Sequence, residues 1–162
     1  MIKFYDDFLS KREYDELYSL LNGYNFPWYY TPNITHNTAA GSNLCYLVHL
    51  FYYHNRPLSE FYDSHINMFL EKLKAKTFIR VKANFYPGQK QLTQHEPHVD
   101  YNYEHKAAIY CINTCDGYTI FKNGEKINSV ANRLITFDGN IEHASTDCTN
   151  ATARININFN YL

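Results

Sequence analysis

The stretch His-Glu-Pro-His-Val-Asp at residues 95–100 is the most informative part of this sequence. On a β-strand, side chains two residues apart point to the same face, so His98 and Asp100 can present an imidazole and a carboxylate to one ion. His95 competes with His98 for this role, but a spacing of three suits a helix and Pro97 argues against one. His98 and Asp100 are therefore predicted as two ligands of one metal ion.

A third ligand must come from elsewhere in the chain, and His143 is well placed for it. It follows a strand expected at Arg133–Asp138 and a turn at Gly139. Two histidines and one carboxylate on one face of an octahedral ion leave three positions open, as in non-haem Fe(II) oxygenases. Arg154, at the start of the next alternating segment, is suited to a bidentate grip on a small dicarboxylate.

Around this motif the chain is expected to be helical first and β-rich later. Ser10 and Glu13 form a capping box that predicts a helix ending at Gly23. Apolar residues at helical spacing predict a second helix from about Pro57 to Lys74. Extended segments and loops are expected between the two helices.

From Thr77 onward, short alternating segments are separated by turn residues. Strands are expected at Phe78–Tyr86, Ala107–Asn113, Tyr118–Lys122, Arg133–Asp138 and Ala153–Tyr161. Asn123-Gly124 predicts a two-residue hairpin turn. The fold class is therefore α+β and mainly β, with a closed or double-sheet β core supported by N-terminal helices.

Composition limits the function classes. The chain has 162 residues, of which 45% are hydrophobic and 19% charged, and its formal net charge is −1. A chain of this length and composition fits one globular domain, and its near-neutral charge disfavours a long nucleic-acid footprint. It shows neither an apolar run of roughly 18 residues nor the layout of a signal peptide, so no membrane partner and a cytoplasmic location are expected.

The 16 Tyr and 11 Phe are interpreted first as the codon bias of a low-GC genome, with a virus as one option for its source, and only second as a sign of function. The four cysteines form no Cys-x-x-Cys pair and are expected as reduced thiols. The basic run Lys72, Lys74, Lys76, Arg80 and Lys82 is interpreted as a solvated face, with phosphate contact as the alternative. Outside the motif, surface or hydrogen-bonded roles are expected for His36, His49, His54, His65 and His105.

The ordered set His98-x-Asp100, His143 and Arg154 in a short β-rich chain resembles the Fe(II)/2-oxoglutarate-dependent dioxygenases. It is most similar to their prolyl-4-hydroxylase-like branch, which includes small phage and bacterial versions. The resemblance covers roughly residues 79–161. It implies a double-stranded β-helix, or jelly-roll, core over about residues 77–162, with helical support over about residues 1–76, in a single oxygenase domain over residues 1–162.

Position by position, the resemblance implies that His98, Asp100 and His143 bind Fe(II). Arg154 corresponds to the residue that pairs with the distal carboxylate of 2-oxoglutarate, and Tyr86 to a tyrosine that donates its hydroxyl to the same carboxylate.

Other parts of the resemblance are less regular. Asn84 and Asn156 resemble the Asn-x-Tyr and Arg-x-Asn pairs of the alkylated-base repair branch, where they help to hold the cosubstrate. The family's Gly-Gly-x-Thr is here Asp-Gly-Tyr-Thr at residues 116–119. Either Tyr110 or Cys111 is expected to stand where some members carry a second cosubstrate-binding tyrosine.

The resemblance implies an enzyme that uses Fe(II), 2-oxoglutarate and O₂, with ascorbate as an additional reductant, to hydroxylate an unactivated C–H bond. The substrate that it favours is a peptidyl proline or another amino-acid residue in a peptide or protein. The alternatives are nucleobase oxidation or demethylation, a non-catalytic jelly-roll module that binds metal or sugar, and a zinc hydrolase. Specificity is expected to lie in Tyr24–Asn43 and Gln89–Pro97. The sequence gives no indication of the oligomeric state.

Overall fold

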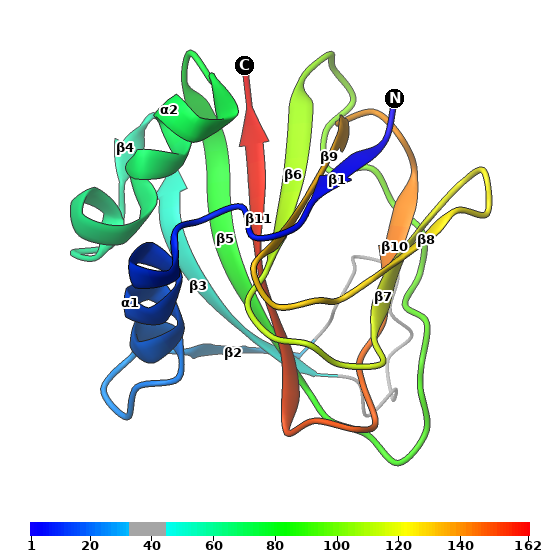
Figure 1. Ribbon diagram of the computed structural model, residues 1–162. Helices are drawn as coiled ribbons and strands as arrows, with labels where there is room; N and C mark the ends of the chain where they lie inside the picture. Colours follow the sequence, from blue (N-terminus) through cyan, green and yellow to red (C-terminus); the bar gives the residue numbers. More distant parts are fainter. Residues whose placement is uncertain (33–44) are drawn as a thin grey trace.

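Two antiparallel sheets lie face to face, and helices cover the outer face of the larger sheet (Figure 1). This is the computed structural model of the protein, and it describes residues 1–32 and 45–162. The helices are α1 (Lys11–Leu21), a π-helical turn (Tyr62–Ile66) and α2 (Met68–Leu73). The strands are β1 (Lys3–Tyr5), β2 (Tyr29–Thr31), β3 (Tyr46–Tyr53), β4 (Arg56–Pro57), β5 (Phe78–Pro87), β6 (Lys106–Cys111), β7 (Tyr118–Phe121), β8 (Lys126–Asn128), β9 (Arg133–Asp138), β10 (His143–Ser145) and β11 (Ala153–Tyr161).

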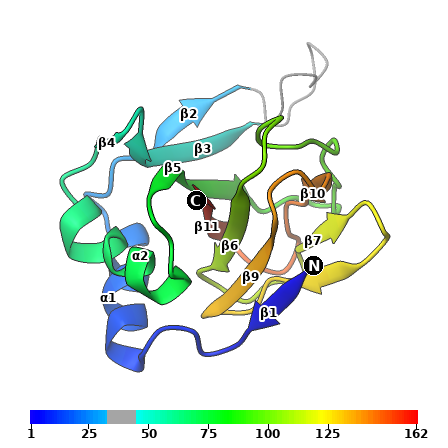
Figure 2. The ribbon, with the colours of Figure 1, turned by 90° about the horizontal axis from the view of Figure 1, so that it is seen from above.

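The larger sheet has the order β1-β9-β6-β11-β5-β3-β2, with β4 added to β3, and the smaller has the order β10-β7-β8. Seen from above, the smaller sheet lies across the larger one on the side away from the helices (Figure 2). The expected strands Arg133–Asp138 and Ala153–Tyr161 have the predicted bounds, and the other three differ by one or two residues. The predicted double-sheet core, mainly β with helical support, is confirmed.

Strand β11 lies in the middle of the larger sheet, and both of its faces are buried. Ile155, Ile157 and Phe159 belong to the core between the sheet and the helices. The residues between them, Arg154, Asn156, Asn158 and Asn160, turn to the opposite face, because successive side chains of a strand alternate. The central strand therefore directs a row of polar side chains toward the space between the sheets.

Strand β6 turns Tyr110 and Cys111 to opposite faces of the larger sheet, and neither is among the residues that line the pocket described below. Tyr110 packs in the core under the helices and donates its hydroxyl hydrogen bond to Oδ1 of Asn132 at 2.8 Å. Cys111 belongs with Ile109 to the second core, between the sheets. Cys111, not Tyr110, therefore faces the side on which the polar row of β11 lies.

Helix α1 begins as predicted: Ser10 and Glu13 form both halves of the capping box. The helix buries Leu17 and Leu21 and ends at Asn22, one residue before the expected Gly23. Helix formation after Pro57 starts later than predicted. Residues 56–57 pair with β3 as β4, so the chain turns helical only at Tyr62 and leaves the helix at Lys74, which has a left-handed backbone.

Two expectations need correction. The hairpin at Asn123-Gly124 forms, but its loop has three residues, because Phe121 pairs with Glu125. Within this loop, Gly124 is the one residue with a positive φ, of 85°. This fits a type I turn followed by a bulge rather than a two-residue turn. The support over residues 1–76 is not purely helical, because β1, β2, β3 and β4 all belong to the larger sheet.

Part of the predicted specificity segment Tyr24–Asn43 lies outside the described residues. Within the ranges 1–32 and 45–162, no helix is long and apolar enough to span a membrane.

Candidate metal centre and its pocket

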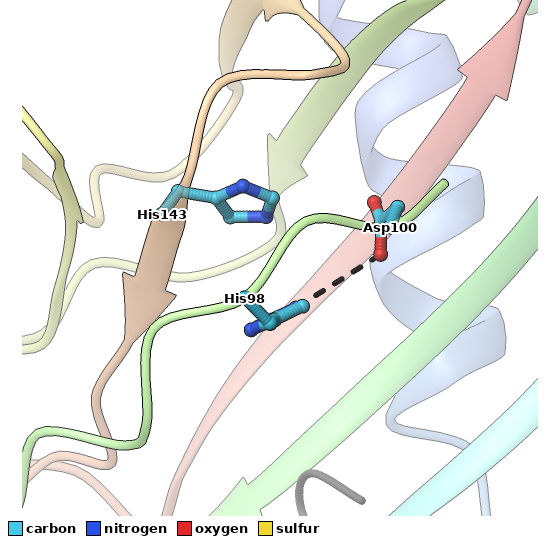
Figure 3. Close-up of side chains that lie close together, drawn as sticks. All are labelled: His98, Asp100 and His143. Carbon is cyan, nitrogen blue, oxygen red and sulfur yellow. Dashed lines mark ion pairs between the residues drawn. The ribbon is translucent and has the colours of Figure 1, made fainter. Parts of the chain in front are cut away.

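His98, Asp100 and His143 converge, each with one ligand atom within 4.8 Å of the others (Figure 3). Nε2 of His98 lies 3.9 Å from Oδ1 of Asp100, and the two imidazole rings are 4.8 Å apart. The main chains of His98 and His143 exchange hydrogen bonds of 2.9 and 3.0 Å, which fixes the two ligand-bearing segments side by side. The segment that carries His98 and Asp100 is not the β-strand assumed from their spacing: His98 forms an isolated antiparallel bridge to His143, and Gln94 forms one to Thr146.

The backbone sets the tautomers of both histidines. Nδ1 of His143 lies 3.0 Å from the carbonyl oxygen of Ile141, and Nδ1 of His98 lies 3.3 Å from that of Glu96. Because a carbonyl oxygen only accepts, Nδ1 carries a proton in each ring, which leaves Nε2 as the nitrogen that can bind a metal. Burial lowers the pKa of His143 despite the opposing charge of Asp100. His143 is thus held as a neutral ligand.

Asp100 is held ionised by its neighbours. Its side chain is only 6% exposed, and this burial by itself would raise its pKa. The effect is outweighed by Arg80, whose Nη2 lies 2.7 Å from Oδ1, by His143, and by Nδ2 of Asn160, which donates to Oδ2 at 2.9 Å. The pKa of Asp100 therefore lies well below its usual range. Two imidazoles and one carboxylate form a donor set that fits a divalent transition metal.

The pocket beside this cluster is lined by residues from both sheets. They are Tyr46, Lys82, Asn84, Tyr86, His98, Asp100, Ile109, Thr119, His143, Ser145, Asn156 and Asn158. Asn84 and Asn156 lie opposite each other in register, and Nδ2 of Asn84 donates to Oδ1 of Asn156 at 2.9 Å. Tyr86 stacks on Tyr46 at 5.3 Å, and burial raises the pKa of its hydroxyl. Six of the seven predicted site residues thus line one pocket.

The seventh, Arg154, lies behind Thr119 and is fully buried. Its Nη1 donates to the carbonyl oxygen of Thr146 and its Nη2 to Oγ1 of Thr119, each at 3.0 Å. Nε has no partner, and no carboxylate pairs with the guanidinium in the part of the chain that the structure describes. Residues 33–44 contain no Asp or Glu. A buried cation without a counter-ion is costly, so this arrangement favours binding of an anion.

Gly117 provides the room that Arg154 occupies. A Cβ atom at this position would lie 2.5 Å from the carbonyl oxygen of Asp147 and 2.7 Å from Cδ of Arg154. In the variant motif Asp-Gly-Tyr-Thr, the glycine therefore allows close approach, and Thr119 supplies a hydroxyl both to Arg154 and to the pocket.

The basic run was interpreted wrongly in part. Lys72, Lys74 and Lys76 are exposed as expected, but Arg80 and Lys82 are partly buried and lie at the site. The signal was present in the sequence: polar residues alternate along β5, as they do along β11, at Arg80, Lys82, Asn84 and Tyr86. The same alternation along β11 carries Asn158 and Asn160, and their contacts with Asp100 were not predicted either.

His95, the alternative ligand, does not join the cluster. Its Nδ1 lies 2.8 Å from Oγ of Ser145, and its ring lies 5.1 Å from that of Tyr86. Burial, together with the charge of Arg154, lowers its pKa to about 4. His95 is therefore a neutral wall residue behind the pocket.

Searches against family models and curated proteins gave no match. Solved structures do share the fold. A 2OG-Fe(II) oxygenase family protein from Burkholderia pseudomallei matches with a TM-score of 0.71 at 10% identity, over 99% of this chain and 84% of that one. A Pseudomonas putida prolyl-4-hydroxylase matches with a TM-score of 0.66 at 11% identity, over 99% and 91%. A prolyl hydroxylase from Trichoplax adhaerens, in complex with a hypoxia inducible factor peptide fragment, matches with a TM-score of 0.64 at 15% identity, over 99% and 83%. The chain therefore has the jelly-roll fold of these oxygenases.

Proposed function

We propose that this protein is an Fe(II)- and 2-oxoglutarate-dependent dioxygenase that hydroxylates an unactivated C–H bond. The observation that carries the proposal is the fully buried Arg154, which has no carboxylate partner among the described residues and contacts Thr119 of the pocket that His98, Asp100 and His143 line. The cluster has the donors for one divalent metal, and the arginine favours binding of one anion. A metal-chelating dicarboxylate such as 2-oxoglutarate satisfies both.

His98, Asp100 and His143 would hold Fe(II) through two Nε2 atoms and one carboxylate oxygen. Arg154 would bind the distal carboxylate of 2-oxoglutarate. Tyr86 would donate to the same carboxylate, since its raised pKa keeps the hydroxyl protonated. When bound, this iron and cosubstrate supply the oxidation: O₂ and 2-oxoglutarate are converted to succinate and CO₂, and one oxygen atom enters the substrate C–H bond.

The remaining residues orient these groups. Arg80, Asn158 and Asn160 hold the Asp100 carboxylate in one position. The paired amides of Asn84 and Asn156 lie between the metal ligands and Arg154, where they can hold the middle of the cosubstrate. The protein would therefore position the metal-binding carboxylate and the cosubstrate and exclude water from them.

For the substrate, we favour a peptidyl proline or another amino-acid residue. Two of the structural neighbours are prolyl hydroxylases, and one of them is in complex with a peptide. The net charge of −1 makes a nucleic acid less suitable. A screen of proline peptides for 2-oxoglutarate-dependent succinate release, with mass detection of a product heavier by one oxygen atom, tests this choice.

The test of the reaction class is anaerobic. Fe(II) and 2-oxoglutarate added to the protein should produce a visible metal-to-ligand charge-transfer band. The band should disappear in His98→Ala and Asp100→Ala and persist in His65→Ala, a histidine outside the pocket. Absence of the band in the unaltered protein, or its survival in Asp100→Ala, would refute the proposal. A band without succinate release under O₂ would instead indicate a non-catalytic binding module.

A further inference from the structure

Lys82 is a second cation at the pocket that the proposed reaction does not use. It lies on β5, two residues before Asn84 and four before Tyr86, and its side chain lines the pocket together with the three proposed metal ligands. It stands in register with Asn158, whereas Arg154 stands in register with Tyr86. Four residues of strand separate the two positions by about 13 Å. The two cations therefore serve different parts of the pocket.

Lys82 lacks a counter-ion. Among the described residues, its Nζ approaches the hydroxyl of Tyr46, at 3.4 Å, and the ring of the same tyrosine, at 5.5 Å. Asp100, the nearby carboxylate, is already held by Arg80 at 2.7 Å. No carboxylate pairs with Lys82 among residues 1–32 and 45–162, and the segment 33–44 contains no Asp or Glu. Burial lowers the pKa of Lys82 to about 8, so the ammonium group stays mainly protonated at pH 7.

The charges at the proposed site do not balance without a further anion. The cations are the metal, Arg80, Lys82 and Arg154. Among the described residues that line the pocket, Asp100 is the one with a carboxylate. Both carboxylates of 2-oxoglutarate already have partners, the distal one in Arg154 and the other in the metal. Positive charge at Lys82 therefore remains after the cosubstrate has bound.

We propose that Lys82 binds a carboxylate of the prime substrate, so that the enzyme acts on a peptide with an acidic residue beside the carbon that is hydroxylated. This inference rests on the proposed function, because it takes the metal and 2-oxoglutarate to be bound as described there. Tyr46 supports the site, since its hydroxyl and its ring both lie beside the ammonium group of Lys82. The second source of a carboxylate is the metal-bound end of 2-oxoglutarate, and the experiment distinguishes the two.

The experiment measures binding without turnover, by calorimetry under anaerobic conditions with Mn(II) in place of Fe(II). The probes are 2-oxoglutarate and acetylated peptide amides with a central proline, prepared in matched pairs that carry Asp or Glu in one member and Asn or Gln in the other. The variants are Lys82→Met, which keeps the length and removes the charge, Lys82→Arg, which keeps the charge, and the control Lys3→Met, an exposed lysine on β1 of the same sheet. Thermal melting establishes that each variant is folded.

With 2-oxoglutarate saturating, at least one acidic peptide should bind about 10-fold more tightly than its amide partner. Lys82→Met should abolish that preference and change the Kd of 2-oxoglutarate by less than about 2-fold, whereas Lys82→Arg and Lys3→Met should keep the preference. If no acidic peptide is preferred, or if the preference survives Lys82→Met, the proposal is wrong.

Two other outcomes also overturn it. A 10-fold loss of 2-oxoglutarate affinity in Lys82→Met would assign the lysine to the cosubstrate. Lys82-dependent binding of a short single-stranded DNA, without binding of any acidic peptide, would assign it to a nucleic-acid phosphate. Failure of 2-oxoglutarate to bind the unaltered Mn(II) protein would refute the proposed function itself, a result distinct from a failure at Lys82.

Discussion

Arg154 shows how a single residue can reveal a missing ligand. A fully buried guanidinium with an orphaned Nε and no carboxylate partner in the described chain destabilises the protein unless an anion neutralises it. The burial of Arg154 behind the pocket therefore supports the proposal that it binds an anion.

Replacing Arg154 with methionine should separate binding from stability. Arg154→Met should weaken 2-oxoglutarate binding to the Mn(II) protein by about 100-fold, because a charge-assisted pair is lost. The melting temperature of the ligand-free protein should stay unchanged or rise, since an uncompensated buried charge is removed. Calorimetry and thermal melting measure the two effects, with the exposed Arg12→Met as control. Unchanged affinity together with a large loss of stability would mean that Arg154 is structural.

His95 predicts a dependence of stability on pH. Its folded-state pKa is lowered to about 4, whereas an unfolded histidine titrates near 6.5. The unfolded chain therefore binds more protons in this window, and the contribution of His95 is fully present above about pH 6.5 and is lost as pH falls toward 4. Between pH 7 and pH 5 the loss should be about 2 kcal/mol.

Urea unfolding of the metal-free protein at the two pH values measures this loss. His95→Gln should reduce the difference in unfolding free energy between pH 7 and pH 5, and His65→Gln should not. An equal difference in the unaltered protein and His95→Gln would show that other groups cause the acid sensitivity.

At the scale of elements, helix α1 depends on its capping box and buttresses the sheet through Leu17 and Leu21. Ser10→Ala removes a side-chain acceptor from the helix N-terminus and should lower the free energy of unfolding by about 1 kcal/mol. Ser19→Ala on the exposed face of the same helix should have no such cost, since alanine is the better helix former. Urea unfolding compares the two. A similar effect at both positions would refute the assigned role of the cap.

Strands β5 and β11 are the elements that build the site. Each places polar side chains on alternate positions, and their antiparallel register brings Asn84 opposite Asn156 and Tyr86 opposite Arg154. A slip of one residue would turn every one of these side chains toward the helices. The apolar residues between them, packed under α1 and α2, prevent such a slip.

At the scale of the whole molecule, the site joins segments from both sheets, so its ligands should stabilise the entire fold. Mn(II) and 2-oxoglutarate, each at about 100 times its Kd, should together raise the melting temperature by roughly 10–20 °C. Asp100→Ala should lose most of this increase, and His65→Ala should keep it. Thermal melting with and without ligands measures it. An equal increase in Asp100→Ala would place the metal elsewhere.

The sequence by itself determined the elements and the candidate ligands. The capping box and the strand periodicity are local patterns. The order of His98, Asp100, His143 and Arg154 is likewise visible from positions along the chain alone. Only the tertiary structure decided which polar residues meet. Arg80, Lys82 and Asn160 looked like members of a solvated face or an ordinary strand until pairing of β5 with β11 brought them to Asp100 and the pocket. Alternation predicts that side chains share a face, but what that face contacts depends on strand order and register, which are set by packing between segments distant in sequence.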